Sequence, residues 1–250
     1  MRTYLLLLPC ALAAGCIFPQ YKAEKTLEFT LPIAGLKKLH CESHNGDITI
    51  TGDAKATMIA LRADLSVRGH SQAEADANLH LLEVMREQVG DTLRIHGKYP
   101  AAELSNRSPG FRFTMTVPPE LAVQLTSHNG DIAAVGMSGS AAIETHNGDV
   151  KGNLTTHHVV ATTHNGDVEL KLSGDGPLDG ELRSHNGDIE VVVDERLGTR
   201  LEASTHNGKV TPPSRLEGPA TVAKRRVTCK IGDGKGKLVI DTHNGDVVIR

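Results

Sequence analysis

Apolar and polar residues alternate along most of the chain, on both sides of a recurring tetrapeptide that begins with histidine. An apolar residue such as Ile143 or Leu182 stands three places before the histidine, and a Ser or Thr stands directly before it. A β-branched residue such as Val150 or Ile189 follows the tetrapeptide, and the positions between are mostly polar. Alternation with a period of two is typical of half-buried β-strands. Each tetrapeptide is therefore predicted to join two strands, with the apolar residues and the Ser/Thr facing inward and the histidine facing outward.

The tetrapeptide His-Asn-Gly-Asp occurs seven times, once in the variant His-Asn-Gly-Lys. The copies begin at His44, His128, His146, His164, His185, His206 and His243, with spacings of 84, 18, 18, 21, 21 and 37 residues. A fixed period of about 20 residues indicates an array of stacked structural repeats. The stretch Val227–Lys230 with the following Ile231-Gly232-Asp233-Gly234 is interpreted as a degenerate repeat that fills the last step.

Two architectures fit this pattern: an antiparallel meander closed by Asn-Gly hairpins, and a β-solenoid in which Asn-Gly forms a repeated corner. Asn and Gly tolerate positive φ, which suits either kind of turn. Identical residues at one phase of every repeat favour the solenoid, because stacking brings all copies into register. We therefore predict a mainly β chain, a β-solenoid array of 18–21-residue repeats with a small α+β cap region near the N-terminus.

The segment between the first two copies differs from the repeats and is expected to form the cap region. Residues 57–67 alternate as a strand, Ser71 and Glu74 form a capping box that opens a helix toward residue 81, and residues 83–88 and 92–98 form a hairpin. Residues 101–110 are interpreted as a polar loop and 111–117 as a strand. The predicted organisation is a signal segment at 1–16, a tether at 17–26, the first repeat with the cap region at 27–120, and the repeat array at 121–250.

The N-terminus indicates export. Residues 5–15 are apolar or small, a stretch too short to span a bilayer but typical of a signal-peptide core. Small residues precede Cys16, as in the bacterial lipobox, so we expect Cys16 to be lipidated; an ordinary secretory cleavage is the alternative. Ile17 stands where an Asp would signal inner-membrane retention in a Gram-negative cell. The expected location is the cell envelope, as an outer-membrane lipoprotein.

Composition narrows the function. The chain of 250 residues carries a formal net charge of −3 and 3% aromatic residues, so a basic nucleic-acid-binding footprint is excluded. The content of 23% charged residues is ordinary for a folded protein. No cofactor is expected.

The repeated His and Asp are the candidate chemical groups. In a solenoid, one outward row would contain His128, His146, His164, His185 and His206, and a second row beside it would contain Asp131, Asp149, Asp167 and Asp188. The first four histidines and the four aspartates are the candidate metal ligands. One hypothesis is a divalent-metal or proton-responsive surface. The alternative, which we favour, is that the histidines are solvated strand-end residues and that each Asp bonds the turn backbone.

No residue is singled out as a catalyst, because the seven Ser/Thr-His pairs are equivalent. In addition, the Ser or Thr and the His of each pair are adjacent on a strand, so their side chains point to opposite faces. Cys41 and Cys229 fall on inward positions, which predicts buried free thiols, with a disulfide between them as the alternative. The chain stops soon after Val247-Val248-Ile249, so an open C-terminal edge is expected to allow self-association.

The whole arrangement resembles the bacterial putative adhesin domain family, also known as a domain of unknown function. The resemblance rests on the lipoprotein start, the first Asn45-Gly46-Asp47 unit, the strand closing in Val117-Pro118-Pro119, and the serial Ser/Thr-x-Asn-Gly-Asp units that follow. It implies a β-solenoid-like fold, an envelope location and no catalytic residues. The expected function is a non-enzymatic, envelope-anchored adhesin or interaction scaffold that meets the membrane through its lipid and binds an envelope or surface ligand. The alternatives are the metal- or pH-responsive surface and a β-helix enzyme acting on polysaccharide.

Overall fold

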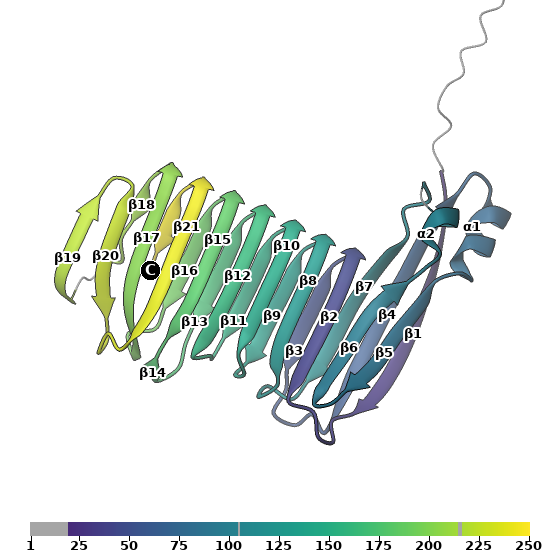
Figure 1. Cartoon of the computed structure of the whole chain (residues 1–250), viewed down its shortest axis with the longest axis horizontal. Helices are drawn as coiled ribbons and strands as arrows, with labels where there is room; N and C mark the ends of the chain where they lie inside the picture. The colour runs from purple at the N-terminus through teal and green to yellow at the C-terminus, as the bar shows by residue number, and fades with distance from the viewer. Residues whose placement is uncertain (1–19, 105, 215–216) are drawn as a thin grey trace, which may run out of the picture.

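The chain forms two long β-sheets that face each other. The structure is a computed structural model that describes residues 20–104, 106–214 and 217–250. Figure 1 shows the strands of both sheets lined up along the longest axis, with the two helices at the N-terminal end of the array. We call the ten-stranded sheet, which contains the first strand, sheet A, and the twelve-stranded sheet, which contains β14 as an extra partner of β17, sheet B. The prediction of a mainly β structure is confirmed.

Sheet A begins with three long antiparallel strands and continues with short parallel strands. In spatial order it contains β1 (Tyr21–Pro32), β4 (Met58–Gly69), β7 (Gly110–Val117), β3 (Ile48–Gly52), β9 (Ile132–Met137), β11 (Val150–Leu154), β13 (Val168–Leu172), β16 (Ile189–Val193), β22 (Val247–Ile249) and β18 (Val210–Thr211).

Sheet B is parallel in its centre and ends in an antiparallel hairpin at each side. In spatial order it contains β19 (Glu217–Ala223), β20 (Arg226–Ile231), β17 (Leu197–Asn207), β21 (Gly236–Asn244), β15 (Asp179–Asn186), β12 (His158–Asn165), β10 (Ala141–Asn147), β8 (Ala122–Asn129), β2 (Lys38–Asn45), β6 (Thr92–Lys98) and β5 (Glu83–Val89). The off-path strand β14 (Gly176–Pro177) pairs with β17.

Each copy of the tetrapeptide lies where the chain passes from sheet B to sheet A. In one winding, β10 ends at Asn147 and β11 begins at Val150, so the residues between them form a corner between the sheets. Neighbouring windings pair in parallel with equivalent residues opposite each other, as in Thr145 opposite Thr163. The hairpin alternative is therefore wrong for the repeats. The Asn of the repeat does not use the positive φ that it tolerates, because among the described residues Ser108 is the only non-glycine with positive φ.

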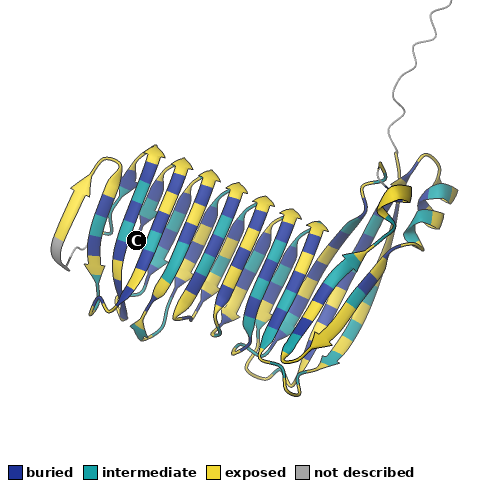
Figure 2. Cartoon of the chain, in the orientation of Figure 1, coloured by how far each residue is buried: buried dark blue, intermediate teal, exposed yellow. Residues whose placement is uncertain are grey.

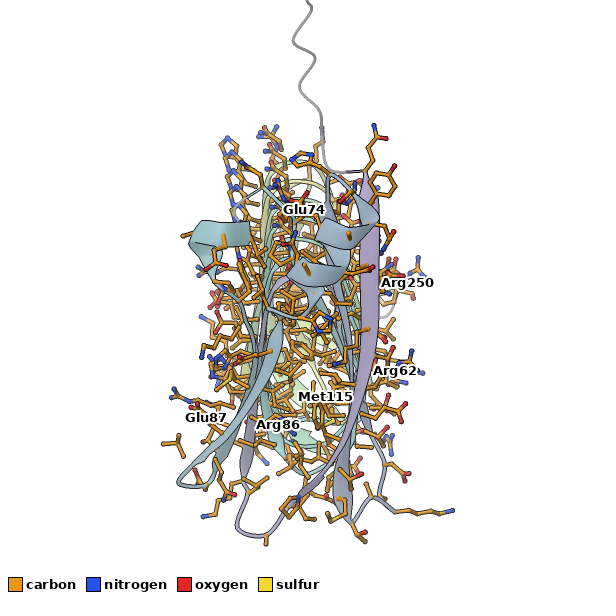
Figure 3. The ribbon with its side chains drawn as sticks, turned by 90° about the vertical axis from the view of Figure 1, so that its right-hand side faces the viewer. Arg62, Glu74, Arg86, Glu87, Met115 and Arg250 are labelled. Atoms are coloured by element: carbon orange, nitrogen blue, oxygen red, sulfur yellow. The ribbon has the colours of Figure 1, made fainter. Side chains whose placement is uncertain are left out.

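The core fills the space between the two sheets. Figure 2 shows buried and exposed positions alternating along almost every strand, as the two-residue period predicts. The inward residues include the Ser or Thr before each histidine, and Thr145 and Thr163 are each 2% exposed. In the end-on view of Figure 3, Met115 lies between the sheets, whereas Arg62 and Arg250 point outward from sheet A.

The cap region contains the predicted elements with small shifts. The helix α1 (Gln72–Leu79) begins after Ser71, whose hydroxyl accepts a hydrogen bond from the Glu74 amide at 3.1 Å. The strands β4, β5, β6 and β7 occupy the expected segments. The predicted loop at 101–110 instead contains the short helix α2 (Ala101–Leu104), because Leu104 is an apolar anchor that is 1% exposed.

The last winding does not follow the order of the sequence. Strand β21 pairs with β15 on one side and β17 on the other, so the seventh copy of the repeat lies between the fifth and the sixth. The stretch Val227–Lys230, predicted as the start of a degenerate repeat, lies in strand β20, which runs antiparallel to β17. The predicted open edge at the C-terminus is also wrong, because β22 pairs with β16 and β18.

The two predictions for the N-terminal segment, a tether and a lipidated signal segment, have different outcomes. The tether predicted at 17–26 is shorter, because β1 begins at Tyr21 and pairs with β4 from its first residue. Strand β1 lies at the edge of sheet A, and Ala23 is its only buried residue. The signal segment and Cys16 lie outside the described residues. Within the described residues, no helix combines the length and apolarity needed to span a membrane.

Cys41 and Cys229 are both buried and both free, so the disulfide alternative is wrong for this structure. The order β20-β17-β21-β15-β12-β10-β8-β2 separates their strands by seven spacings, or about 34 Å at the usual distance between strands. Burial raises the pKa of both thiols, which keeps them protonated and unreactive.

Candidate functional site

The corner of every winding carries three parallel ladders of hydrogen bonds to the neighbouring winding. The Asn amides form one ladder, in which Asn147 Nδ2 donates to Asn129 Oδ1 at 2.8 Å. The Asp carboxylates form the second, in which Asp131 Oδ1 accepts from the Asp149 amide at 2.9 Å. The buried hydroxyls form the third, in which Thr145 Oγ1 donates to the Gly130 carbonyl at 2.9 Å. The Asn, the Asp and the Ser or Thr of each repeat thus hold neighbouring windings in register.

Glycine is required at the corner because the windings stack so closely there. A Cβ built on Gly148 would lie 2.2 Å from the Gly130 carbonyl oxygen, and one on Gly187 would lie 2.0 Å from the Gly166 carbonyl oxygen. No side chain fits at such distances without moving the backbone. The glycine at this position of every repeat therefore reflects close contact between windings as well as turn geometry.

The ladders end where the stack ends. At the first winding, Asn45 Nδ2 donates to the Pro109 carbonyl and Ser43 Oγ to the Phe111 carbonyl, so the cap region supplies the missing partners. At the other end stands Lys209, in the one winding that lacks Asp. The Lys209 amide donates to Asp246 Oδ1 at 2.8 Å, but no later winding needs a carboxylate at this position.

The seven histidines form one continuous row, which we call the imidazole ladder. In spatial order it contains His44, His128, His146, His164, His185, His243 and His206. Neighbouring ring centroids are 4.7–4.9 Å apart and the ring planes differ by 2–6°. This spacing equals the distance between paired strands, so the stack follows directly from the in-register pairing. All seven side chains are exposed.

The ladder changes the acid–base properties of its central member. Partial desolvation, together with the neighbouring His185 and His146, lowers the pKa of His164 below its ordinary value. A proton on one ring disfavours a proton on the next, because two unit charges about 4.8 Å apart repel by about 1 kcal/mol in water. His164 therefore takes up a proton less readily than an isolated histidine does.

The predicted metal residues are brought into rows but do not converge. Within the described residues, no group of three or more His, Cys, Asp or Glu side chains is placed to hold a metal ion. Two imidazole nitrogens bound to one Zn²⁺ lie at most about 4.2 Å apart, whereas the parallel rings are spaced at 4.7–4.9 Å. A cation between two neighbouring rings would require both rings to tilt.

A polar groove runs beside the imidazole ladder across the outer face of sheet B. Its volume is about 770 Å³, and its lining includes six of the seven imidazoles. Its other lining residues include the outward side chains two positions before these histidines, namely Glu42, Thr126, Glu144, Thr162, Arg183 and Asp241. We call this feature the imidazole groove.

Sequence reasoning missed the groove and part of the ladder. The predicted row contained His128, His146, His164, His185 and His206, to which the structure adds His44 and His243. The predicted bond from Asp to the turn backbone exists, but it reaches the turn of the next winding. The polar residues two places before each histidine were visible as alternation, and their shared outward phase was the signal for the groove.

The two-sheet stack of identical corners defines a repeat protein of the mainly β class. A similar fold occurs in a putative cell adhesion protein from Clostridium sporogenes, with 12% identity, a TM-score of 0.56 and coverage of 91% of this chain and 99% of that one. A putative adhesin from Bacteroides fragilis matches with 15% identity and a TM-score of 0.41, over 94% and 100% of the two chains. A comparison with curated proteins gives no match.

The Toastrack DUF4097 family model matches residues 13–250. Because the match spans nearly the whole chain, the protein belongs to the Toastrack DUF4097 family.

Proposed function

We propose that this protein is a non-enzymatic, envelope-anchored scaffold that binds a surface or envelope ligand, as an adhesin does. One observation carries this proposal: the Ser or Thr, the Asn and the Asp of the repeat recur at one position in successive windings and hydrogen-bond to the neighbouring winding. An enzyme needs a unique nucleophile or acid–base pair, and the corners offer equivalent groups instead. The array is best regarded as solenoid-like, a rigid rod that presents a periodic surface.

The name of the Clostridium sporogenes protein, a putative cell adhesion protein, agrees with this role. Export and lipidation at Cys16 would place the scaffold at the membrane, where β1 begins at Tyr21, only a few residues later. Outer-membrane placement and self-association belong to the same proposal. Among the described residues, the strand edges that end a sheet and are available for self-association are those of β19, β5 and β1, because the Val210 amide of β18 donates to the Lys224 carbonyl at 2.9 Å.

Adhesion of native cells tests the proposal. We expect a deletion strain to lose adhesion or cell–cell aggregation, and complementation with the full chain to restore it. A Cys16→Ala variant is expected to restore it poorly, since the scaffold would no longer be anchored. Intact mass spectrometry of the membrane fraction reports lipidation in the same strains. Equal adhesion by all strains, or turnover of an envelope glycan by the purified chain, would overturn the proposal.

The imidazole ladder favours a second function, a metal- or proton-responsive surface. Its exposed rings offer soft nitrogen donors in a row, and rotation of neighbouring rings would bring two nitrogens onto one cation. Equilibrium dialysis with Zn²⁺, Ni²⁺ and Cu²⁺ at about pH 7.5 tests this function. Saturable binding that is lost in a His146→Asn/His164→Asn variant supports it, and no saturable binding ends it. No observation favours the polysaccharide-active enzyme.

A further inference from the structure

We infer that the imidazole groove is a binding site for a linear, non-anionic polysaccharide that lies along the array. The inference rests on the proposed function as a non-catalytic scaffold and names the ligand class that this surface fits.

The direction of the groove requires a long, thin ligand. Its lining residues come from β2, β8, β10, β12, β15 and β21, which are consecutive neighbours in sheet B. Six strands are separated by five spacings, so the groove extends for about 24 Å at right angles to the strands. A volume of about 770 Å³ spread over this length leaves room for one extended polymer chain and little else.

The lining excludes a lipid chain. Ser, Thr, His, Glu, Asp and Arg line the groove, and among the described residues that contact it none has an aliphatic or aromatic hydrocarbon side chain. An acyl chain would gain no apolar contact and would desolvate these polar groups at a cost. The hydroxyls, carboxylates and imidazoles instead supply hydrogen-bond donors and acceptors in every winding.

The charge excludes a polyanion at neutral pH. Glu42, Glu144 and Asp241 place three carboxylates on the floor, against the single guanidinium of Arg183, which pairs with Glu181 outside the groove lining. Histidine side chains are mostly neutral at pH 7.5. A nucleic acid or polyuronate would therefore meet net repulsion, and a carboxylate ladder lies on the other side of the imidazoles as well.

The repeat distance disfavours an extended peptide. Equivalent groups recur in the groove with the 4.7–4.9 Å spacing of the imidazole ladder, whereas an extended peptide advances about 3.2–3.4 Å per residue. A linear glycan has one ring, bearing several hydroxyls, for each step of the chain, and its rings in β-1,4 linkage alternate in orientation. The floor alternates in the same way in its first four windings, with Glu42, Thr126, Glu144 and Thr162.

Binding of defined oligosaccharides tests this inference. The probes are linear glucose and N-acetylglucosamine oligomers of two to six rings, in β-1,4, β-1,3 and α-1,4 linkage, measured by isothermal titration calorimetry with the purified full chain at about pH 7.5. We expect at least one series whose affinity rises about tenfold or more from two to five rings. Oligogalacturonates of the same lengths are expected to bind at least tenfold more weakly.

Two variants in the floor locate the site. Thr162→Lys is expected to reduce the affinity for the best oligomer at least tenfold, because its long side chain projects into the middle of the groove. Thr114→Lys, an exposed threonine on the outer face of sheet A, is the matched control and should bind like the wild type. Circular dichroism checks folding, and Thr126→Lys on β8 replaces Thr162→Lys if that variant unfolds.

Three results would overturn the inference: no binding in any series, affinity independent of length, or equal loss in the control variant. These results are distinct from failure of the proposed function. A chain that binds no glycan but still supports cell adhesion would refute the groove as a glycan site and leave the scaffold function intact. Glycan binding by the purified chain, together with unchanged adhesion of the deletion strain, would instead refute the scaffold function.

Discussion

At the residue scale, most residues of the repeated tetrapeptide and the Ser or Thr before it contact the adjacent winding. Ser or Thr, Asn and Asp each bond to the adjacent winding, and Gly leaves space for it. Lys209 supports this interpretation, because Asp is replaced only in the winding that has no further winding to hold. The histidine is the exception: in the described residues it makes no ladder hydrogen bond, and it contacts the neighbouring winding through ring stacking.

Gly148→Ala is expected to destabilise the protein by about 3 kcal/mol, in the range of strained or overpacked substitutions. The added Cβ would lie 2.2 Å from the Gly130 carbonyl oxygen. The control is Gly35→Ala, where nothing lies within 4 Å and only the left-handed φ of 76° opposes the side chain, at about 1 kcal/mol. Urea unfolding measures both; a smaller loss for Gly148→Ala than for Gly35→Ala would contradict the close stacking.

Removal of both neighbours should raise the pKa of His164. Desolvation, His185 and His146 together hold this pKa below the ordinary value of 6.5, and a His146→Asn/His185→Asn variant removes two of these three causes. Proton NMR of the His164 ring, titrated between about pH 4 and 8, measures the change. Because the folded pKa is the lower one, the unfolded chain binds more protons as the pH falls below about 6.5, and the wild type should lose stability in that range. An unchanged or lower pKa in the variant would rule out coupling between rings.

At the element scale, stability should depend on where in a ladder a residue stands. Asn165 donates to Asn147 and accepts from Asn186, each at 2.8 Å, whereas Asn207 in the terminal winding only donates to Asn244. Asn165→Ala should therefore cost about 2 kcal/mol and Asn207→Ala about 1 kcal/mol, at a net value of about 1 kcal/mol for each hydrogen bond. Chemical denaturation compares the two variants directly. Equal losses of unfolding free energy in the two variants would mean that the second hydrogen bond of Asn165 in the amide ladder adds nothing to stability.

The elements show which parts of the fold a sequence can predict. Strands and inward positions were predicted because the two-residue period at Ile143, Thr145 and Val150 is a local property of the chain. The order of the last windings was not, because the repeat around His243 is as good a neighbour for His185 as the repeat around His206 is. Edge strand β1 was missed although Leu27, Phe29 and Leu31 alternate with polar residues and pack partly buried against the core, because Lys25 interrupts the pattern and no neighbouring turn signal marks where the strand begins.

The candidate site was predictable only in part, for the same reason. The rows of His and Asp follow from identical phase in each repeat, so His128, His146, His164 and His185 could be placed together from the sequence. The groove depends on pairing across strands that are far apart in the chain, such as β2 with β8 and β15 with β21. Those pairs bring Glu42 beside Thr126 and Arg183 beside Asp241, and no local pattern contains that information.

At the scale of the whole molecule, the inserted last winding ties the end of the array together. Strand β21 is the parallel partner of both β15 and β17, and β22 joins β16 to β18. Without β21 and β22, the strands β17, β19 and β20 still pair with one another, but the short pairing of β14 with β17 is the only strand pairing that joins them to the rest of the described array. The final fifteen residues are therefore expected to determine whether residues 197–231 fold onto the rest of the array.

A chain truncated after Lys235 tests this dependence. Amide hydrogen exchange should show loss of protection in residues 197–214 and 217–231, because β17 loses β21, the strand that joins it to β15 in sheet B, and β18 loses its partner β22 in sheet A. Protection in β8 to β13 should persist, since those strands pair with one another and with the cap region. These strands act as the internal control in the same sample. Full protection of residues 197–231 in the truncated chain would show that the terminal windings are stable without the inserted one, and the order of stacking would then be a detail of packing rather than the closure of the fold.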